Sequence, residues 1–474
     1  MEMKNDLNSL LNPKSICIVG ATENSLFVRK IVSNLESQGF NGKLYMVNPK
    51  YDSVFRYPAF PTILDVPQPV ENAIFLIPAK FTLDAVKQCA EKGVKSITIV
   101  SSGFAENGRV DGGKLQQEIK EIANKNNILL SGPNCFGAIS TWNQIANFCE
   151  TIPGKLGKGN IGIVMQSGGL LASIVYLAQN RGIDFSYFIS SGNEAELESA
   201  DYLRFMLDDP ETHVLCGFIE GIQDKAKFIE VADLALERKK PIIVVKIGSS
   251  DRGAEVAFRH TGAVTGSDTE FNTLCREKGI IRVYDLDDLL EIAGFFSKVC
   301  KSRPLVGRKV AVITVSGGGA GLISDIGCDE GFEFPPLSEE TFKNLLRIVP
   351  EFGFVANPLD VTTQVFSNPA IYIECVEHLL KENNIDVLAF AWALGIPREP
   401  VPVATIIEGV SQIVKKTDRL CMLFSIAQLG LNEYGRELLK KCDIPFIQGT
   451  RRAFRAIRSL IEYNQAIRNF TKPS

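Results

Sequence analysis

Several common sequence features are missing from this chain of 474 residues. It has no run of basic residues, and its formal net charge is −4, so nothing in it would neutralise a nucleic-acid backbone. No apolar run approaches the roughly 20 residues of a membrane span, and residues 1–12 are polar, without the apolar region of a signal peptide. We therefore expect no nucleic-acid partner and no membrane partner.

Paired cysteines are missing as well. The eleven cysteines are scattered without a Cys-x-x-Cys pair, and some of them, such as Cys17 and Cys216, lie in apolar stretches typical of strands. This usage indicates reduced, buried thiols in a cytoplasmic protein, with no disulfide framework and no zinc site. We expect no metal ligands and no tightly bound cofactor.

The glycine fingerprint of nicotinamide-binding Rossmann domains is also absent. The first apolar strand ends at Gly20 and is followed by Ala21 and Thr22, with no Gly-x-Gly-x-x-Gly. No acidic residue ends the second strand, where Asn48-Pro49-Lys50 stands instead. These absences disfavour a nicotinamide oxidoreductase. Lys50 suits a phosphate, for example one on a nucleotide ribose, or is a solvated surface charge.

What the chain does have is a regular alternation of short apolar runs and helical patterns, which predicts right-handed crossovers and parallel, doubly wound sheets. Two linkers, at residues 152–160 and 301–308, divide the pattern. We expect an α/β protein in which a Rossmann-like domain (residues 1–150) precedes two flavodoxin-like domains (residues 158–300 and 305–474). The second and third units share one opening, a strand followed by Ser-Gly-Gly and a helix.

In such sheets, ligands bind outside the carboxyl ends of the strands. Gln166-Ser167-Gly168-Gly169 joins a strand to a helix, an arrangement that cradles anions, although the pair of glycines could serve only close packing. It lacks the Gly-Lys-Ser/Thr ending of a P-loop and is not a self-sufficient ATP site. Another strand ends at Ser191-Gly192-Asn193.

One of only three histidines, His260, lies among small residues in the segment 258–268, which predicts an exposed loop before a helix capped by Ser267. An imidazole near a helix N-terminus suits a nucleophile that carries a phosphoryl group, whereas the alternative is an ordinary surface histidine. Glu220, at the end of a neighbouring strand, is its natural partner: a carboxylate would fix the imidazole tautomer and leave the other nitrogen free to attack phosphorus. A strand-end glutamate in water is the alternative for Glu220.

Taken in order along the chain, these motifs resemble those of a known family. The chain is similar, from about residue 11 to 469, to the α subunit of NDP-forming acyl-CoA synthetases of the ADP-forming acetyl-CoA synthetase type, which are related to succinyl-CoA synthetase. The segments that carry the resemblance are 47–50, 102–106, 132–137, 166–169, 191–193, 220–221, 260–262, 266–268 and 357–360.

The resemblance implies a phosphohistidine at His260, with Glu220 held against it. Acyl-CoA and phosphate would give an acyl phosphate and CoA, and His260 would pass the phosphoryl group to ADP. It implies CoA as a substrate at Gly20, Ala21, Thr22, Lys50, Pro78, Ser101, Ser102, Asn134 and Cys135. It implies phosphate binding by Ser167, Gly168, Gly169, Ser191, Gly192 and Asn193.

Nothing in the chain resembles the ATP-grasp half of such an enzyme. The resemblance therefore implies a separate ATP-grasp β subunit that supplies ADP or ATP and Mg²⁺, most simply in an α2β2 assembly. A second interpretation is a non-catalytic CoA-binding regulatory or scaffold protein of the same fold. Retention of both His260 and Glu220 argues against it, since a decayed site would need neither. The acyl group, the nucleotide base and the physiological direction do not follow from the sequence.

Overall fold

A computed structural model describes residues 6–261, 266–299, 305–394 and 400–471 of the chain. The chain divides into two compact units, one of residues 1–179 and 184–289, the other of residues 180–183 and 290–474. Unit 1 holds two seven-stranded sheets and unit 2 a five-stranded sheet. The α/β class expected from the sequence is confirmed, and the parallel strands are those of Rossmann-like and flavodoxin-like folds.

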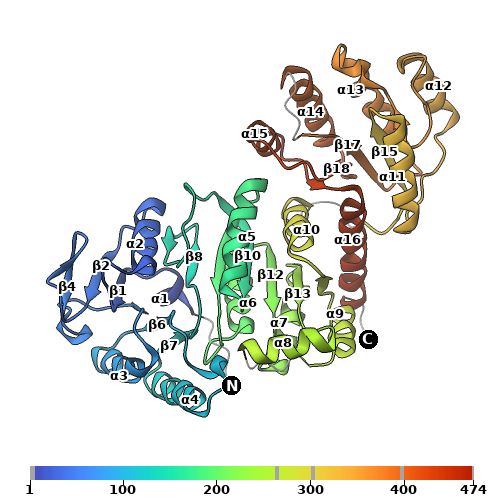
Figure 1. The fold of residues 1–474 in the computed structure, drawn as a ribbon. Helices are drawn as coiled ribbons and strands as arrows, with labels where there is room; N and C mark the ends of the chain where they lie inside the picture. The colour runs from blue at the N-terminus through green and yellow to red at the C-terminus, as the bar shows by residue number, and fades with distance from the viewer. Residues whose placement is uncertain (1–5, 262–265, 300–304, 395–399, 472–474) are drawn as a thin grey trace. The chain divides into compact units, whose positions relative to one another are not determined.

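The first sheet has the order β3-β4-β2-β1-β5-β6-β7, and its strands are parallel except for the β3–β4 hairpin. Helices α3 and α4 lie on one side of this sheet and α2 lies on the other (Figure 1). Alternate residues of β1 face these helices: Cys17 packs toward α3 and α4, and Ile18 packs toward α2. This alternation buries the strand on both faces, which explains its unbroken apolar run. The bounds are α1 Asn8–Leu11, β1 Ser15–Val19, α2 Leu26–Gln38, β2 Lys43–Val47, β3 Ser53–Val54, β4 Tyr57–Phe60, η1 Ile63–Asp65, β5 Asn72–Phe75, η2 Ala79–Phe81, α3 Thr82–Lys92, β6 Ser96–Ile99, η3 Ala105–Asn107, α4 Val110–Lys125 and β7 Leu129–Ser131.

The second sheet has the order β14-β13-β12-β10-β11-β8-β9. Its five strands from β14 to β11 are parallel, whereas β8 pairs antiparallel with β11, so a segment within the range predicted for the first domain joins the second sheet. Helices α6, α7 and α9 cover one face of this sheet. The bounds are β8 Ala138–Ser140, β9 Ile145–Ala146, β10 Lys158–Met165, α5 Gly168–Arg181, β11 Phe185–Ser190, α6 Ser199–Asp208, β12 Val214–Ile219, α7 Lys225–Glu237, β13 Ile242–Lys246, α8 Asp251–Thr261, α9 Asp268–Glu277, β14 Ile281–Val283 and α10 Leu286–Val299.

The third sheet, in unit 2, has the order β16-β15-β17-β18-β19 and is parallel throughout. Helices α12, α13, α14 and α15 contribute to the core on one face of it. The bounds are β15 Val310–Thr314, α11 Gly317–Asp329, α12 Glu339–Ile348, β16 Leu359–Asp360, η4 Thr363–Phe366, α13 Pro369–Leu379, β17 Val387–Ala391, α14 Pro400–Val414, β18 Leu420–Ser425, α15 Glu433–Cys442, β19 Phe446–Gln448 and α16 Thr450–Phe470. The three predicted domain ranges, 1–150, 158–300 and 305–474, stay a prediction.

Candidate functional site

The predicted phosphate and catalytic residues gather at one edge of the second sheet. Strands β12, β10 and β11 are neighbours and run parallel, so their carboxyl ends meet at the same edge. Glu220 follows β12, Ser167 follows β10, and Ser191 follows β11. Helix α8, which contains His260, follows β13 on the other side of β12.

Glu220 is held by the side chain of Gln166, the residue that follows the adjacent strand β10. It is 4% exposed, and its backbone N–H donates to Oε1 of Gln166 over 2.5 Å. The same oxygen accepts from the backbone N–H of Gly221 at 3.1 Å, and Nε2 of Gln166 donates to the Gly221 carbonyl at 2.8 Å. Gln166 therefore joins the ends of β10 and β12 and fixes the backbone that carries the Glu220 carboxylate.

The two glycines that open α5 differ in their surroundings. A Cβ on Gly168 would lie 2.5 Å from the ring of Phe136, so close packing explains this glycine. Gly169 is exposed, and a Cβ there would meet nothing within 4 Å. The first turn of α5 still presents backbone N–H groups at the sheet edge, where helix N-termini favour anions. Phosphate binding at Ser167, Gly168 and Gly169 stays a prediction.

The loop after β11 packs tightly against the loop after β7. Gly192 has φ of +62°, and a Cβ on it would lie 2.2 Å from the Pro133 carbonyl oxygen, so only glycine fits. The backbone N–H of Asn193 donates to that carbonyl at 2.9 Å. Ser191 is fully buried, and its hydroxyl donates to Glu194 at 2.7 Å. The roles predicted for Ser191, Gly192 and Asn193 in phosphate binding stay predictions.

Glu194 is a buried carboxyl that sequence reasoning missed. It is 7% exposed and accepts hydrogen bonds from the Ser191 hydroxyl, the Ser199 backbone N–H and the Ser199 hydroxyl. Burial raises the pKa of the Glu194 carboxyl to about 7, although hydrogen bonds from Ser199, Ser191 and Gln166 oppose the rise. The Ser-Gly-Asn-Glu spacing was the only signal that could have pointed to it.

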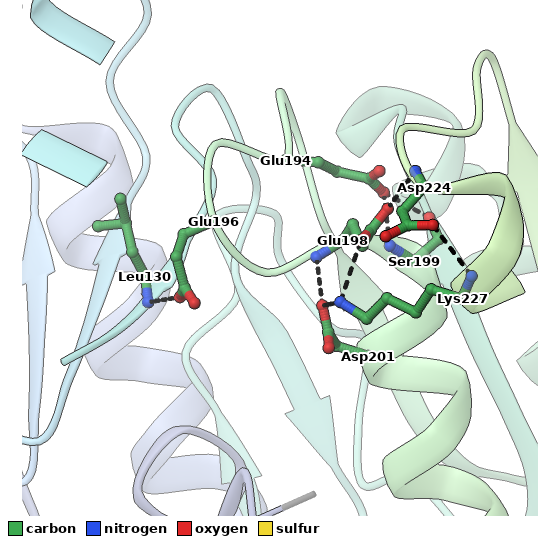
Figure 2. Close-up of polar contacts among 8 residues, drawn as sticks. All are labelled: Leu130, Glu194, Glu196, Glu198, Ser199, Asp201, Asp224 and Lys227. Carbon is green, nitrogen blue, oxygen red and sulfur yellow. Dashed lines mark hydrogen bonds and ion pairs between the residues drawn. The ribbon is translucent and has the colours of Figure 1, made fainter. Parts of the chain in front are cut away.

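A buried ion cluster braces the helix that follows this loop. Figure 2 shows the Lys227 ammonium group beside the carboxylates of Glu198 and Asp201, at 3.0 and 2.6 Å. Burial disfavours the charged lysine, but these two carboxylates outweigh it and hold the pKa of Lys227 above its usual value. Glu198 also accepts from the backbone N–H of Asp224, the residue that caps α7. The cluster thus ties the N-termini of α6 and α7 together next to the site.

The segment around His260 corrects one prediction. Residues 258–261 form the last turn of α8 and are not a loop, because the helix that begins at Asp251 continues to Thr261. The side chain of His260, and residues 262–265, lie outside the part of the chain that the structure describes. Ser267 caps α9 by accepting from the Glu270 backbone N–H, which confirms the predicted cap.

The first of the predicted CoA-binding residues lie at the ends of neighbouring strands in the first sheet. Gly20 follows β1 with φ of +89°, and a Cβ on it would lie 2.7 Å from the Leu76 carbonyl oxygen. Ala21 is buried, and its carbonyl accepts from the Asn48 amide at 2.9 Å. The Thr22 hydroxyl accepts from the Asn24 backbone N–H.

The other predicted CoA-binding residues follow β2, β5, β6 and β7. Lys50, Pro78 and Ser102 are exposed, whereas Ser101 donates from its hydroxyl to the Ile77 carbonyl. Cys135 is fully buried, and burial raises the pKa of its thiol to about 11, so it is a poor nucleophile. All nine residues lie at or after the carboxyl ends of the first sheet's strands, and CoA binding by them stays a prediction.

The two sheets of unit 1 meet through Glu106, a second residue that sequence reasoning did not select for the site. Its carboxylate accepts from the side-chain amide of Asn193 at 2.5 Å and from the backbone N–H groups of Gly103 and Phe104. Asn134 donates to the other side of the Asn193 amide at 3.3 Å. Residues predicted to bind CoA and residues predicted to bind phosphate are therefore in direct contact.

Among the residues that the structure describes, no helix combines the length and the apolar character needed to cross a bilayer. No group of three or more His, Cys, Asp or Glu side chains in the described part of the chain could hold a metal ion.

Two known families match parts of this chain. A CoA binding domain matches residues 14–141, and a succinyl-CoA ligase like flavodoxin domain matches residues 158–296. These matches fall on the first and second sheets.

Relatives match over most of the chain. The ADP-forming acetate–CoA ligase II subunit alpha of Pyrococcus furiosus is 32% identical over 443 residues, which cover 93% of this chain and 94% of that protein. The ADP-forming acetate–CoA ligase II of Archaeoglobus fulgidus is 36% identical over 399 residues, which cover 82% of this chain but only 57% of that protein. This chain thus spans nearly all of one relative and little more than half of the other.

A solved structure is similar over the whole length. It is acetyl-coenzyme A synthetase 1 of Ca. Korarchaeum cryptofilum, described as dinucleotide forming and determined in complex with phosphate and ADP. It has a TM-score of 0.85 and 27% sequence identity, and the match covers 99% of this chain and all of that one.

Proposed function

This chain belongs to the family of ADP-forming acetate–CoA ligases, and from that premise we propose that it is the α subunit of an ADP-forming acid–CoA ligase. The proposed reaction converts acyl-CoA, phosphate and ADP into a carboxylic acid, CoA and ATP, and it can run in either direction. The observation that carries the proposal is the convergence of Glu220, the α5 N-terminus and the β11 loop on one sheet edge, with the His260 helix following the next strand.

In the first step, a phosphate oxygen attacks the thioester carbonyl of acyl-CoA, and CoA leaves as the thiol, giving an acyl phosphate. Backbone N–H groups at the start of α5 would stabilise the phosphate, as a helix N-terminus does for other anions. The residues after β1, β5, β6 and β7 would hold CoA within reach of this phosphate. The first sheet would then position the thioester without forming a covalent intermediate.

In the second step, an imidazole nitrogen of His260 attacks phosphorus, and the carboxylate of the acid leaves. Glu220 would accept a hydrogen bond from the other ring nitrogen and stabilise the positive charge that develops on the ring. The rigid hold of Gln166 on the Glu220 backbone supports this role, because a positioned charge costs no rearrangement during the reaction.

In the third step, the phosphoryl group passes from His260 to ADP. We propose that a separate ATP-grasp β subunit binds the nucleotide and Mg²⁺, in an α2β2 assembly. The relatives support the need for further sequence: one is named as a subunit alpha, and another has much additional length beyond the match. We also propose a cytoplasmic location, since the ten cysteines of the described residues are all free thiols.

The test is to combine this chain with a candidate ATP-grasp subunit and to screen acetate, branched-chain, aryl and dicarboxylic acids for CoA-dependent ATP hydrolysis. We expect turnover with the mixture for at least one acid, and CoA binding but no turnover with this chain alone. Full activity of the isolated chain would contradict the proposed division between subunits. CoA binding without any turnover or phosphoryl labelling would favour the alternative of a non-catalytic CoA-binding module.

A further inference from the structure

Glu106 is a carboxylate that the proposed steps leave without a role, although it lies where the two sheets of unit 1 meet. It stands in η3, just after the loop that carries Ser101 and Ser102. Its Oε1 accepts from the backbone N–H groups of Gly103 at 2.5 Å and Phe104 at 3.1 Å, which fixes that loop.

The other oxygen of Glu106 reaches across to the second sheet. Oε2 accepts from Nδ2 of Asn193 at 2.5 Å, and the same amide nitrogen donates to Gln116 at 3.1 Å. Because an ionised carboxylate only accepts, the nitrogen of the Asn193 amide must face it, and the amide oxygen is left to accept from Asn134. The charge of Glu106 therefore sets the orientation of both asparagines.

The same turn also adjoins the helix of the phosphoryl acceptor, since η3 packs beside α8. The loop after β6 and the loop after β11 thus meet at the Glu106 carboxylate, and α8 lies beside the turn that carries it. Hydrogen bonds to a charged group are worth roughly twice as much as neutral ones, so this link can hold the loops in register.

We propose that Glu106 is a positioning residue that couples the CoA-binding loop of the first sheet to the phosphate-binding loop of the second through Asn193. The inference rests on the function proposed above and adds a residue to it. Glu106 touches no substrate in this role. It sets the distance between thioester and phosphate, which matters for the first step alone, because the second step needs no CoA.

The chemistry of the contact offers a reciprocal exchange as a test. In Asn193→Asp, two carboxylates face each other over the distance of a hydrogen bond, and like charges so close are destabilising. Adding Glu106→Gln restores a matched pair, because the new amide can donate to the carboxylate introduced at position 193 while its oxygen still accepts from Gly103 and Phe104. If Asn193 acted only on phosphate, Glu106→Gln could not repair its loss.

The measurement is phosphoryl labelling of His260 by two donors, acetyl-CoA with radioactive phosphate and radioactive acetyl phosphate. We expect Asn193→Asp to slow labelling from acetyl-CoA and phosphate by about 10- to 100-fold, as fits the loss of a charge-assisted hydrogen bond, and to slow labelling from acetyl phosphate much less. The Glu106→Gln, Asn193→Asp double variant should return to within about threefold of the wild type. Glu118→Gln, on the exposed face of α4, is the matched control and should leave both rates unchanged.

The outcomes separate this inference from the function on which it rests. The positioning role is overturned if the double variant is labelled as slowly as Asn193→Asp, or if Asn193→Asp slows labelling equally with both donors. In either case, labelling of the wild type still supports the proposed ligase. The proposed function itself is contradicted if the wild-type protein takes label from neither donor and also takes none from longer-chain, branched or aryl acyl donors.

Discussion

Replacing Glu194 by glutamine should remove a pH-dependent loss of stability in unit 1. Glu194 is almost completely buried, and burial raises its pKa from 4.5 to about 7 in the folded protein. Between these two values, the folded state binds more protons than the unfolded state, so the free energy of unfolding falls as pH rises. The contribution of this carboxyl is fully present below pH 4.5 and is lost as pH rises through about 7.

The size of the effect follows from the pKa difference. Each pKa unit corresponds to about 1.4 kcal/mol, so ionisation of Glu194 should cost about 3 kcal/mol by pH 8. A loss of this size is a substantial fraction of the roughly 5–15 kcal/mol that stabilises a typical domain. Glutamine is a neutral group of the same shape and can accept from Ser191 and Ser199, so the variant should lack this loss.

The assay is urea unfolding at pH values from about 5 to 8, followed by the fluorescence of Trp142, which lies in unit 1. The other tryptophan, Trp392, lies in unit 2 and is replaced by phenylalanine in all samples, so that one unit is observed at a time. The stability difference between Glu194→Gln and its parent should grow by about 2.5 kcal/mol over this range, and Glu118→Gln should show no such growth. Parallel pH curves for Glu194→Gln and its parent would show that the buried Glu194 carboxyl does not cause this loss of stability.

Three further expectations concern packing, charge and thiol chemistry. Gly192→Ala should lower labelling of His260 from acyl-CoA and phosphate at least tenfold, because its Cβ would lie 2.2 Å from the Pro133 carbonyl; labelling at the wild-type rate would contradict the tight loop contact. Lys227→Met should destabilise unit 1 by about 3–5 kcal/mol in urea unfolding, since it leaves buried carboxylates unpaired, and a change below about 1 kcal/mol would argue against the ion cluster. Iodoacetamide at about pH 8 should modify the exposed Cys328 well before Cys135, whose buried thiol has its pKa raised to about 11, and peptide mapping that finds Cys135 modified first would contradict its burial.

The central strands could be predicted from the sequence because they are buried on both faces. The apolar runs at residues 214–219 and 310–314 predict strands, and β12 and β15 occupy these ranges. Parallel strands of this kind are continuous apolar runs bounded by small residues, so local pattern suffices to find them. The same pattern of strands predicts that Glu220, Ser167 and Ser191 lie at one edge of the sheet.

The short strands β8 and β9 and the end of α8 could not be predicted in the same way. β8 and β9 have three and two residues, and β8 forms by pairing with β11, a distant partner in the chain that no local signal identifies. The small residues after His260 indicated a loop, but the amphipathic helix that starts at Asp251 continues to Thr261.

The residues missed in the candidate site are those whose roles depend on distant contacts. Glu106 and Asn193 are 87 positions apart, and their hydrogen bond exists only because the two sheets of unit 1 meet there. Glu194 became notable through its burial, which no pattern in the sequence indicates. Sequence patterns identify strand ends well and identify the side-chain links between strand ends poorly.

The most direct test of the central claim is to find where the phosphoryl group resides. The protein is incubated with acyl-CoA and radioactive phosphate, digested, and its labelled peptides are mapped, with His260→Asn as the comparison. We expect an acid-labile, base-stable phosphate on the peptide that contains His260 and none in the variant. Label on another residue, or undiminished label and turnover in His260→Asn, would contradict it.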